Sequence, residues 1–396
     1  MESLAGARER IKVCCPLLLL AVADGWERLA YSWVLIDQEV SLFYDLPPIL
    51  SVTELDCPLP SSESTWLASS PDEWIRCLKS HVLCATGGWS ATALRQSMMS
   101  LRELFERFDR DQLFEPGFRP ELLQMRLLLF PLQILVTNLS QTFSYIPEGD
   151  RISTFYSSSS ILQFEDIQLL MHRWLTYFRR AKTEGVRDYV MAKATLILYH
   201  VINLSLFTAF DKLESFARGE TPHSSSREVT ELPSTCLREP EKAFWHCDQI
   251  LRAVGELKIE LWPAWTAAAI YRATIVLWAI SLCHIQGSML WDKRDLGAGN
   301  TDWDVRFDAP LEPGLVSTQS VSDDTGVPHI VASDGSRVSL DNPHSILKLG
   351  LDTIYPGCRT SAFTDGIKCR LEAMSLSWED RHQRLVSLSY ANIYPR

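Results

Sequence analysis

Apolar residues recur every three or four positions along most of this chain, the spacing that places them on one face of an α-helix. The segments that follow this spacing are 26–37, 94–108, 122–139, 161–178, 192–210, 244–261, 264–285 and 367–378. Alternation typical of strands is confined to 314–320 and 327–332, both short and isolated. The pattern therefore predicts a large all-α, multi-helix domain.

One face of the first of these helices gathers large apolar positions together with a carboxylate. These positions are Trp26, Leu29, Ala30, Trp33, Val34 and Asp37. A carboxylate on a packed face needs a hydrogen-bond partner or an arginine, and Ser41 lies one turn later on the same face. We interpret Asp37 as a satisfied packing carboxylate rather than a catalytic one, because no second titratable group converges on it. Pro47-Pro48 is expected to end the helix.

Other helix boundaries can be predicted from local signals. Ser160 and Gln163 fit a capping box at the start of 161–178, and Pro263 is expected to end 244–261. Charged pairs four residues apart are expected on the solvated side of 94–108, namely Arg102 with Glu106 and Glu103 with Arg107.

Three apolar segments are long enough to raise the question of membrane spans. Each carries charged residues, histidine or proline that a span disfavours: Arg126 and Pro131 in 122–139, Lys193 and His200 in 192–210, and Arg272 in 264–286. We interpret all three as core helices of a large helical protein and expect no membrane contact.

The N-terminal region resembles a secretory signal peptide over 8–23. Basic residues precede an apolar run that ends in Ala21-Val22-Ala23. The run continues directly into the helix at Trp26, and the sequons at Asn138 and Asn203 lie in apolar segments unsuited to a glycan. A buried helix is therefore the favoured interpretation.

Two segments break the helical pattern. Residues 217–242 are rich in Ser, Thr, Pro and charge and are predicted to form a loop. Residues 292–342 hold ten acidic and four basic residues and are predicted to form an acidic loop or linker. Such a tract can also serve as an activation segment, although a solvated surface loop is the simpler interpretation.

Charge and cysteine usage narrow the function classes. With 38 basic and 49 acidic residues, the formal charge of −11 argues against a surface that binds polyanions throughout. The ten cysteines include no C-x-x-C pair, which favours buried free thiols and gives no support to a zinc site.

Motif chemistry is nearly absent. The sequence has no G-x-G-x-x-G, Walker A, H-E-x-x-H or G-x-S-x-G motif, so we expect no enzyme and assign no catalytic, cofactor or metal residue. Each weaker candidate has a simpler interpretation. Asp323-Asp324 fits a solvated loop, and the adjacent side chains of His246-Cys247 diverge on a helix. Arg179-Arg180 with Lys182 fits a solvated helix end, and His200 and His284 fit hydrogen-bonded core histidines.

A longer ordered pattern starts at Trp26. Leu35, Asp37 and Ser41 form an apolar-x-Asp-x-x-x-Ser series on the helix, and Pro47-Pro48 follows it. This stretch resembles the middle homology region of fungal-specific transcription factors, in which such a helix runs into a Pro-Pro turn.

The resemblance continues beyond the turn. Residues 49–55, 58–60 and 66–74 match an I-S-x-x-E-L, P-L-P and W…W series, and 346–352 and 366–374 look like the closing helices of that family. The match is specific over 26–74, weaker toward the C-terminus and only helical in between.

The resemblance implies that 1–396 is the helical regulatory domain of a nuclear regulator of RNA polymerase II transcription. Its expected partners are the transcription machinery, related factors as homo- or heterodimers, and a small-molecule effector in an aromatic pocket. In that family an N-terminal six-cysteine or C2H2 module binds zinc and DNA. This sequence contains no such module and starts partway into the region, so zinc and DNA binding are expected only from a missing part.

Two alternatives stay open. The chain could be a regulator without its own DNA reader that dimerises with full-length relatives. It could also be a helical secreted or enzymatic protein with an aromatic pocket.

Overall fold

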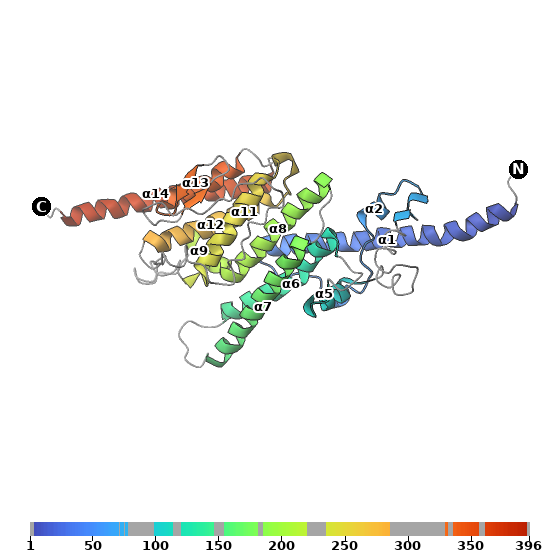
Figure 1. The fold of residues 1–396 in the computed structure, drawn as a ribbon. Coiled ribbons are helices and arrows are strands. Elements are labelled where there is room, and N and C mark those ends of the chain that lie inside the picture. Colours follow the sequence, from blue (N-terminus) through green and yellow to red (C-terminus); the bar gives the residue numbers. More distant parts are fainter. Residues whose placement is uncertain are drawn as a thin grey trace. The chain divides into compact units, whose positions relative to one another are not determined.

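A computed structural model describes most of the chain. The described residues are 4–70, 72–74, 76–77, 99–113, 120–145, 154–180, 185–219, 235–285, 329–331, 336–355 and 361–393. Within them only the backbone is described for 4–23, 144–145, 154–158, 185–188, 329, 331 and 378–393. The chain divides into two compact units, Met1–Ala192 and Lys193–Arg396, which are treated separately below. The all-α prediction is confirmed (Figure 1).

Helix α6 (Leu122–Tyr145) is the centre of the first unit. It packs against α1 (Leu4–Tyr44), α5 (Leu101–Asp109) and α7 (Thr154–Arg180). Residues from Met125 to Gln133 on α6 are all buried, and the Trp174 indole of α7 donates to the Met125 carbonyl at 2.9 Å. The unit also contains a 3₁₀ turn, η1 (Val52–Glu54), and the short helix α2 (Glu63–Trp66).

Helix α1 forms as predicted but turns a different face to the core. Its buried positions from residue 24 onward are Asp24, Tyr31, Val34, Gln38, Ser41 and Leu42. The predicted face is largely solvent-exposed, with Trp26 at 68% and Trp33 at 60%. The prediction was wrong because α1 carries apolar residues on two opposite faces, and the face with more of them is not the one that packs.

The N-termini of α5 and α7 show how local signals can succeed and fail. Helix α5 starts at Leu101 after a capping box in which Ser100 and Glu103 exchange backbone and side-chain hydrogen bonds. The Arg102–Glu106 pair is present at 3.5 Å, whereas Glu103 accepts from the Ser100 amide. Helix α7 starts at Thr154, so the predicted box at Ser160 and Gln163 is wrong and Ser160 is buried inside the helix.

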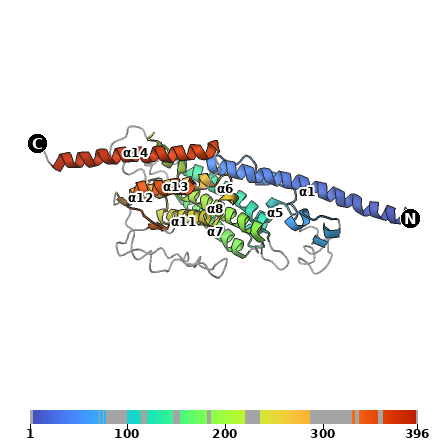
Figure 2. The ribbon, with the colours of Figure 1, turned by 90° about the horizontal axis from the view of Figure 1, so that it is seen from above.

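Helix α12 (Thr266–Ile285) is the centre of the second unit. Every residue from Thr266 to Cys283 is buried. Helix α12 packs against α9 (Phe210–Arg218), α11 (Pro240–Glu256), α13 (Pro343–Ile354) and α14 (Ala362–Ile393). Figure 2 shows α13 beside both α12 and α14. Helix α8 (Gly185–Phe207) contributes the buried residues Ile197 to Leu204, while η3 (Ile259–Leu261) precedes α12.

Three helices are long and apolar enough to cross a membrane by length and composition. They cover Leu122–Phe143, Tyr189–Phe207 and Thr266–Ile285. Their most apolar windows are 67%, 67% and 89% buried inside the protein. The interpretation of these segments as core helices is therefore supported by their packing.

Parts of both predicted loops are ordered. In 217–242, Cys236 and Leu237 are buried, and Ala209 donates to the Cys236 carbonyl at 2.9 Å. In 292–342, β1 (His329–Val331) pairs antiparallel with β2 (Arg337–Ser339). Within the candidate strand at 327–332, the described residues 329–331 are therefore a paired strand. Residues 220–234, 292–328 and 332–335, which include the candidate strand at 314–320 and Asp323-Asp324, lie outside the described residues.

Close packing of α12 against α13 makes Gly350 sensitive to substitution. A Cβ added at Gly350 would overlap the buried Thr274 side chain. We expect Gly350→Ala to lower the free energy of unfolding of the second unit by roughly 1–3 kcal/mol, because α12 or α13 must shift. The change in unfolding free energy can be measured by denaturant unfolding that is monitored by hydrogen exchange of residues 266–285.

Gly366 in α14 is the matched control, because a Cβ there meets nothing within 4 Å. Gly366→Ala should stabilise by roughly 0.5–1 kcal/mol, the helix propensity difference between the two residues. Equal effects of the two substitutions would contradict the assignment of the α12–α13 contact.

Candidate functional site

The segment that carries the family resemblance is a helix with an irregular strap fastened along it. We call residues 49–66 the strap. Apart from η1 and α2, the strap has no regular secondary structure, so its backbone donors and acceptors need side-chain partners. Polar residues of α1 supply many of them.

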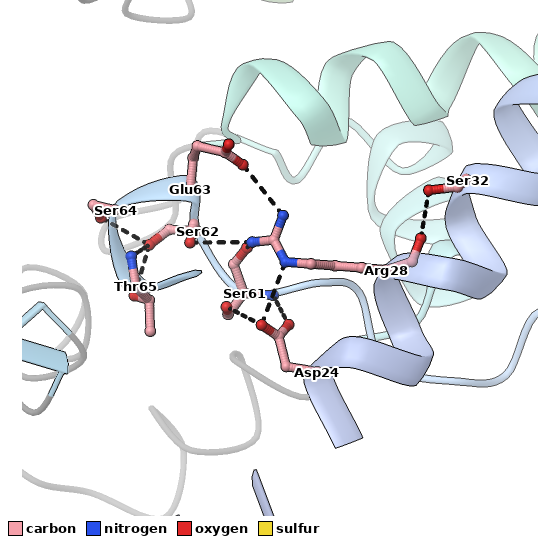
Figure 3. A network of polar contacts seen from close by, with 8 residues as sticks. All are labelled: Asp24, Arg28, Ser32, Ser61, Ser62, Glu63, Ser64 and Thr65. Carbon is pink, nitrogen blue, oxygen red and sulfur yellow. Dashed lines mark hydrogen bonds and ion pairs between the residues drawn. The ribbon is translucent and has the colours of Figure 1, made fainter. Parts of the chain in front are cut away.

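Arg28 is the central residue of this fastening (Figure 3). Its guanidinium donates to the Ser61 carbonyl at 2.6 Å and to the Ser62 carbonyl at 3.3 Å. It also forms ion pairs with Glu63 at 3.2 Å and with Asp24 at 3.3 Å. A planar five-donor fork suits this set of four acceptors, which a lysine could not reach at once.

Asp24 and Trp66 complete the network. The Asp24 carboxylate accepts from the Ser61 amide at 2.7 Å and from the Ser61 hydroxyl at 2.8 Å. The Trp66 ring lies under the Arg28 guanidinium, 4.7 Å from ring centroid to Cζ. One end of the strap is therefore held to α1 by charge-assisted hydrogen bonds and a cation–π contact.

Tyr31 fastens the middle of the strap. Its hydroxyl donates to the Cys57 carbonyl at 2.8 Å and accepts from the Leu101 amide at 3.1 Å. Burial raises the pKa of Tyr31, so the hydroxyl keeps its proton for the Cys57 bond. This one side chain connects α1 to both the strap and the N-terminus of α5.

Asp37 holds the start of the strap, just after Pro47-Pro48. Its carboxylate accepts from the Ile49 amide at 3.0 Å and from the Leu50 amide at 3.0 Å. The prediction of a satisfied carboxylate is confirmed, although Asp37 is half-buried rather than part of a packed face.

Ser41 belongs to a separate buried polar cluster between α1 and α6. The Gln133 amide donates to the Ser41 hydroxyl at 2.8 Å and to the Gln38 carbonyl at 3.1 Å. Arg126 donates to the Gln38 amide oxygen and to Glu39, the latter at 3.1 Å. Burial lowers the pKa of Arg126 to about 10, opposed by Glu39, so the guanidinium is still charged at neutral pH.

A different cluster lies in the second unit, around two histidines. His200 on α8 and His246 on α11 approach through their Nδ1 atoms at 2.8 Å, and both are buried. Phe207 stacks on the His246 ring, with centroids 5.5 Å apart. Burial, followed by His200 and then Lys242, lowers the pKa of His246 well below its usual value, so this imidazole is neutral at pH 7.

The other sequence candidates do not gather into a site. Arg179 and Arg180 lie exposed in the last turn of α7, as predicted, while Lys182 lies outside the described residues. Cys247 is buried, and that burial raises the pKa of its thiol well above the usual value. His284 is half-exposed, with Nδ1 3.2 Å from Asp341, and so the core prediction holds for His200 only.

The predicted burial of the cysteine thiols and of the two sequon asparagines is found for some of these residues and not for others. Free cysteines in the described part are Cys57, Cys77, Cys236, Cys247, Cys283 and Cys369, of which Cys369 is exposed and Cys57 and Cys77 are half-buried. No group of three or more His, Cys, Asp or Glu side chains that could hold a metal occurs among the described residues. Asn203 is buried, but Asn138 is exposed, so the argument against a glycan holds for Asn203 alone.

Comparison with known proteins finds similarity to proteins of fungi that are named transcription factors. The chain is 31% identical over 377 residues to a protein of Zymoseptoria tritici named a transcription factor, a match that covers 89% of the chain and 37% of that protein. It is 31% identical over 356 residues to "Transcription factor 1" of Elsinoe fawcettii, covering 89% of the chain and 36% of that protein. It is 29% identical over 359 residues to "Transcription factor PfmaH" of Pestalotiopsis fici, covering 89% and 35%.

The chain thus spans little more than a third of the length of these relatives. No family model matches the chain, and no solved structure does.

We expect Arg28→Ala to loosen the strap. The substitution removes donors from two carbonyls and leaves Asp24 and Glu63 without their cation, a loss of roughly 2–3 kcal/mol in the local opening free energy. Hydrogen exchange in peptides covering 57–66 should speed up accordingly. Arg110→Ala, which breaks an exposed ion pair with Glu106 on α5, is the control and should change exchange there little. Equal exchange in both variants would show that Arg28 does not hold the strap.

We expect the second unit to lose stability as the pH falls below 6.5. The native pKa of His246 lies below its unfolded value near 6.5, so the unfolded state binds the proton more readily. The stabilisation is complete above pH 6.5 and is lost as the pH falls toward the native pKa. Unfolding midpoints at pH 5 and pH 8 measure the slope, which His246→Phe should flatten while lowering absolute stability. His284→Asn, which removes a half-exposed imidazole, should keep the slope.

Proposed function

We propose that this chain is a helical regulatory part of a fungal transcription factor that modulates RNA polymerase II transcription in the nucleus. The observation that carries the proposal is the similarity over 89% of the chain to proteins named fungal transcription factors. The fold supports it, because the residues of the transcription-factor-like motif fasten the strap to α1 rather than gather around a reaction centre.

DNA and zinc binding are assigned to another part of the regulator. The sequence has no C-x2-C-x6-C and no C2H2 spacing, and its charge is −11. Relatives extend well beyond the matched region, which leaves room in such proteins for a separate zinc module. The chain itself acts through contacts with the transcription machinery or with related factors, or by binding a small-molecule effector. In this proposal it is not an enzyme.

Regulation in this proposal is a shift between two packings of the helical units. The acidic segment 292–342 is the part that would recruit or release the transcription machinery, because acidic residues with scattered apolar ones are typical of activation segments.

A tethering experiment tests the proposal. The full chain, fused to a heterologous DNA-binding domain, should change expression of a reporter in a fungal host at least about fivefold relative to that domain alone. Deletion of 292–328 should weaken an activating effect, and Gly366→Ala, at an open helix position, should leave it unchanged. Nuclear, correctly folded fusions that leave the reporter unchanged would contradict the proposal.

A further inference from the structure

The exposed face of α1 is unusually apolar for a helix that already packs on its opposite side. Trp26, Leu29, Trp33, Ile36 and Val40 are 68%, 49%, 60%, 48% and 45% exposed. They follow one another at intervals of three, four, three and four residues, which is the a/d spacing of a coiled-coil seam. We call these five residues the seam.

The seam belongs to a larger apolar surface that exceeds what a monomer normally exposes. Tyr44, Leu46 and Ile49, at the end of α1 and the start of the strap, are 59%, 53% and 89% exposed. Since a whole aromatic side chain covers about 150–250 Å², Trp26, Trp33 and Tyr44 alone expose roughly 300–450 Å², to which the five aliphatic residues add. Monomers rarely expose more than about 300–600 Å² in one patch, and a stable complex buries about 800 Å² on each partner.

The charges beside the seam favour a partner that is equally uncharged. Between Trp26 and Ile36 the flanking positions are Gly25, Ala30 and Ser32. Farther along, Asp37 accepts two strap amides and Glu39 pairs with Arg126 at 3.1 Å. Neither carboxylate therefore offers a free charge to a partner of opposite sign. An uncharged apolar seam is complementary to itself, as a two-fold interface requires.

We infer that a second copy of this chain covers the seam, with the two α1 helices antiparallel. In an a-to-d pairing, Trp33 of one copy lies against Ile36 of the other and Leu29 lies against Val40, so a large residue meets a smaller one. A parallel pairing would instead bring Trp33 of the two copies to the same level, so that two large side chains would meet. The inference concerns self-association and does not depend on the proposed role in transcription.

Sedimentation equilibrium of the full chain tests the inference. The chain should sediment at twice its 45.0 kDa mass at micromolar concentration. Trp33→Glu and Ile36→Lys should each raise the dimer dissociation constant by at least about thirtyfold, the effect expected for a central interface residue. Leu169→Lys on α7, where the leucine is 57% exposed outside the seam, is the control and should stay dimeric.

Mixing the two seam variants distinguishes the orientation and guards against misfolding. In the antiparallel pairing, the mixture places the new carboxylate opposite the new ammonium at one end and leaves the native Trp33–Ile36 contact at the other. A heterodimer should therefore form from two monomeric variants. A monomeric native chain, or a dimer that Trp33→Glu leaves intact, would overturn the inference. Monomeric variants whose mixture also stays monomeric would overturn the antiparallel pairing.

Discussion

The first unit depends on one constraint, that the irregular strap must have its backbone polar groups satisfied by helix α1. A segment with so little regular structure leaves donors and acceptors unpaired, and each unpaired group costs free energy where water is excluded. Arg28, Asp24, Tyr31 and Asp37 supply partners at successive turns of the helix. The polar residues Arg28, Tyr31 and Asp37 of the family-like motif are thus explained by their hydrogen bonds to the strap.

This explains why the sequence motif is long and ordered. Each fastening residue must face a given strap residue, so the spacing along α1 and the spacing along the strap are coupled. The Pro47-Pro48 turn, for example, places the Ile49 and Leu50 amides where the Asp37 carboxylate can accept from both. The positions of the carboxylate and of the turn in the sequence therefore depend on each other. A regular pattern of this kind could be read from the sequence, whereas its purpose could not, because the acceptors are backbone atoms.

The sequence predicted the helices well and their orientation less well. The segments that form α6, α8 and α12 were predictable because they are apolar on nearly all sides, and such helices are buried in the core. Helix α1 was harder, since its buried face includes Gln38, which looks solvated until Arg126 and Gln133 are brought to it from α6. The His200–His246 contact was missed for the same reason, because the partners lie on different helices and 46 residues apart in the sequence.

Helix α1 therefore has three sides with different tasks. One is buried against α6, one holds the strap, and the third is left apolar and exposed. Fixing two sides of a helix makes the third rigid, and a rigid apolar face loses little conformational entropy when something covers it. The residues that fasten the strap thus contribute to the rigidity of an exposed surface that they do not form themselves. By holding the strap, they also hold Ile49, which extends the exposed apolar surface beyond the end of the helix. In the proposed regulatory role such a preorganised surface matters, because the effects of the chain would come from what it binds.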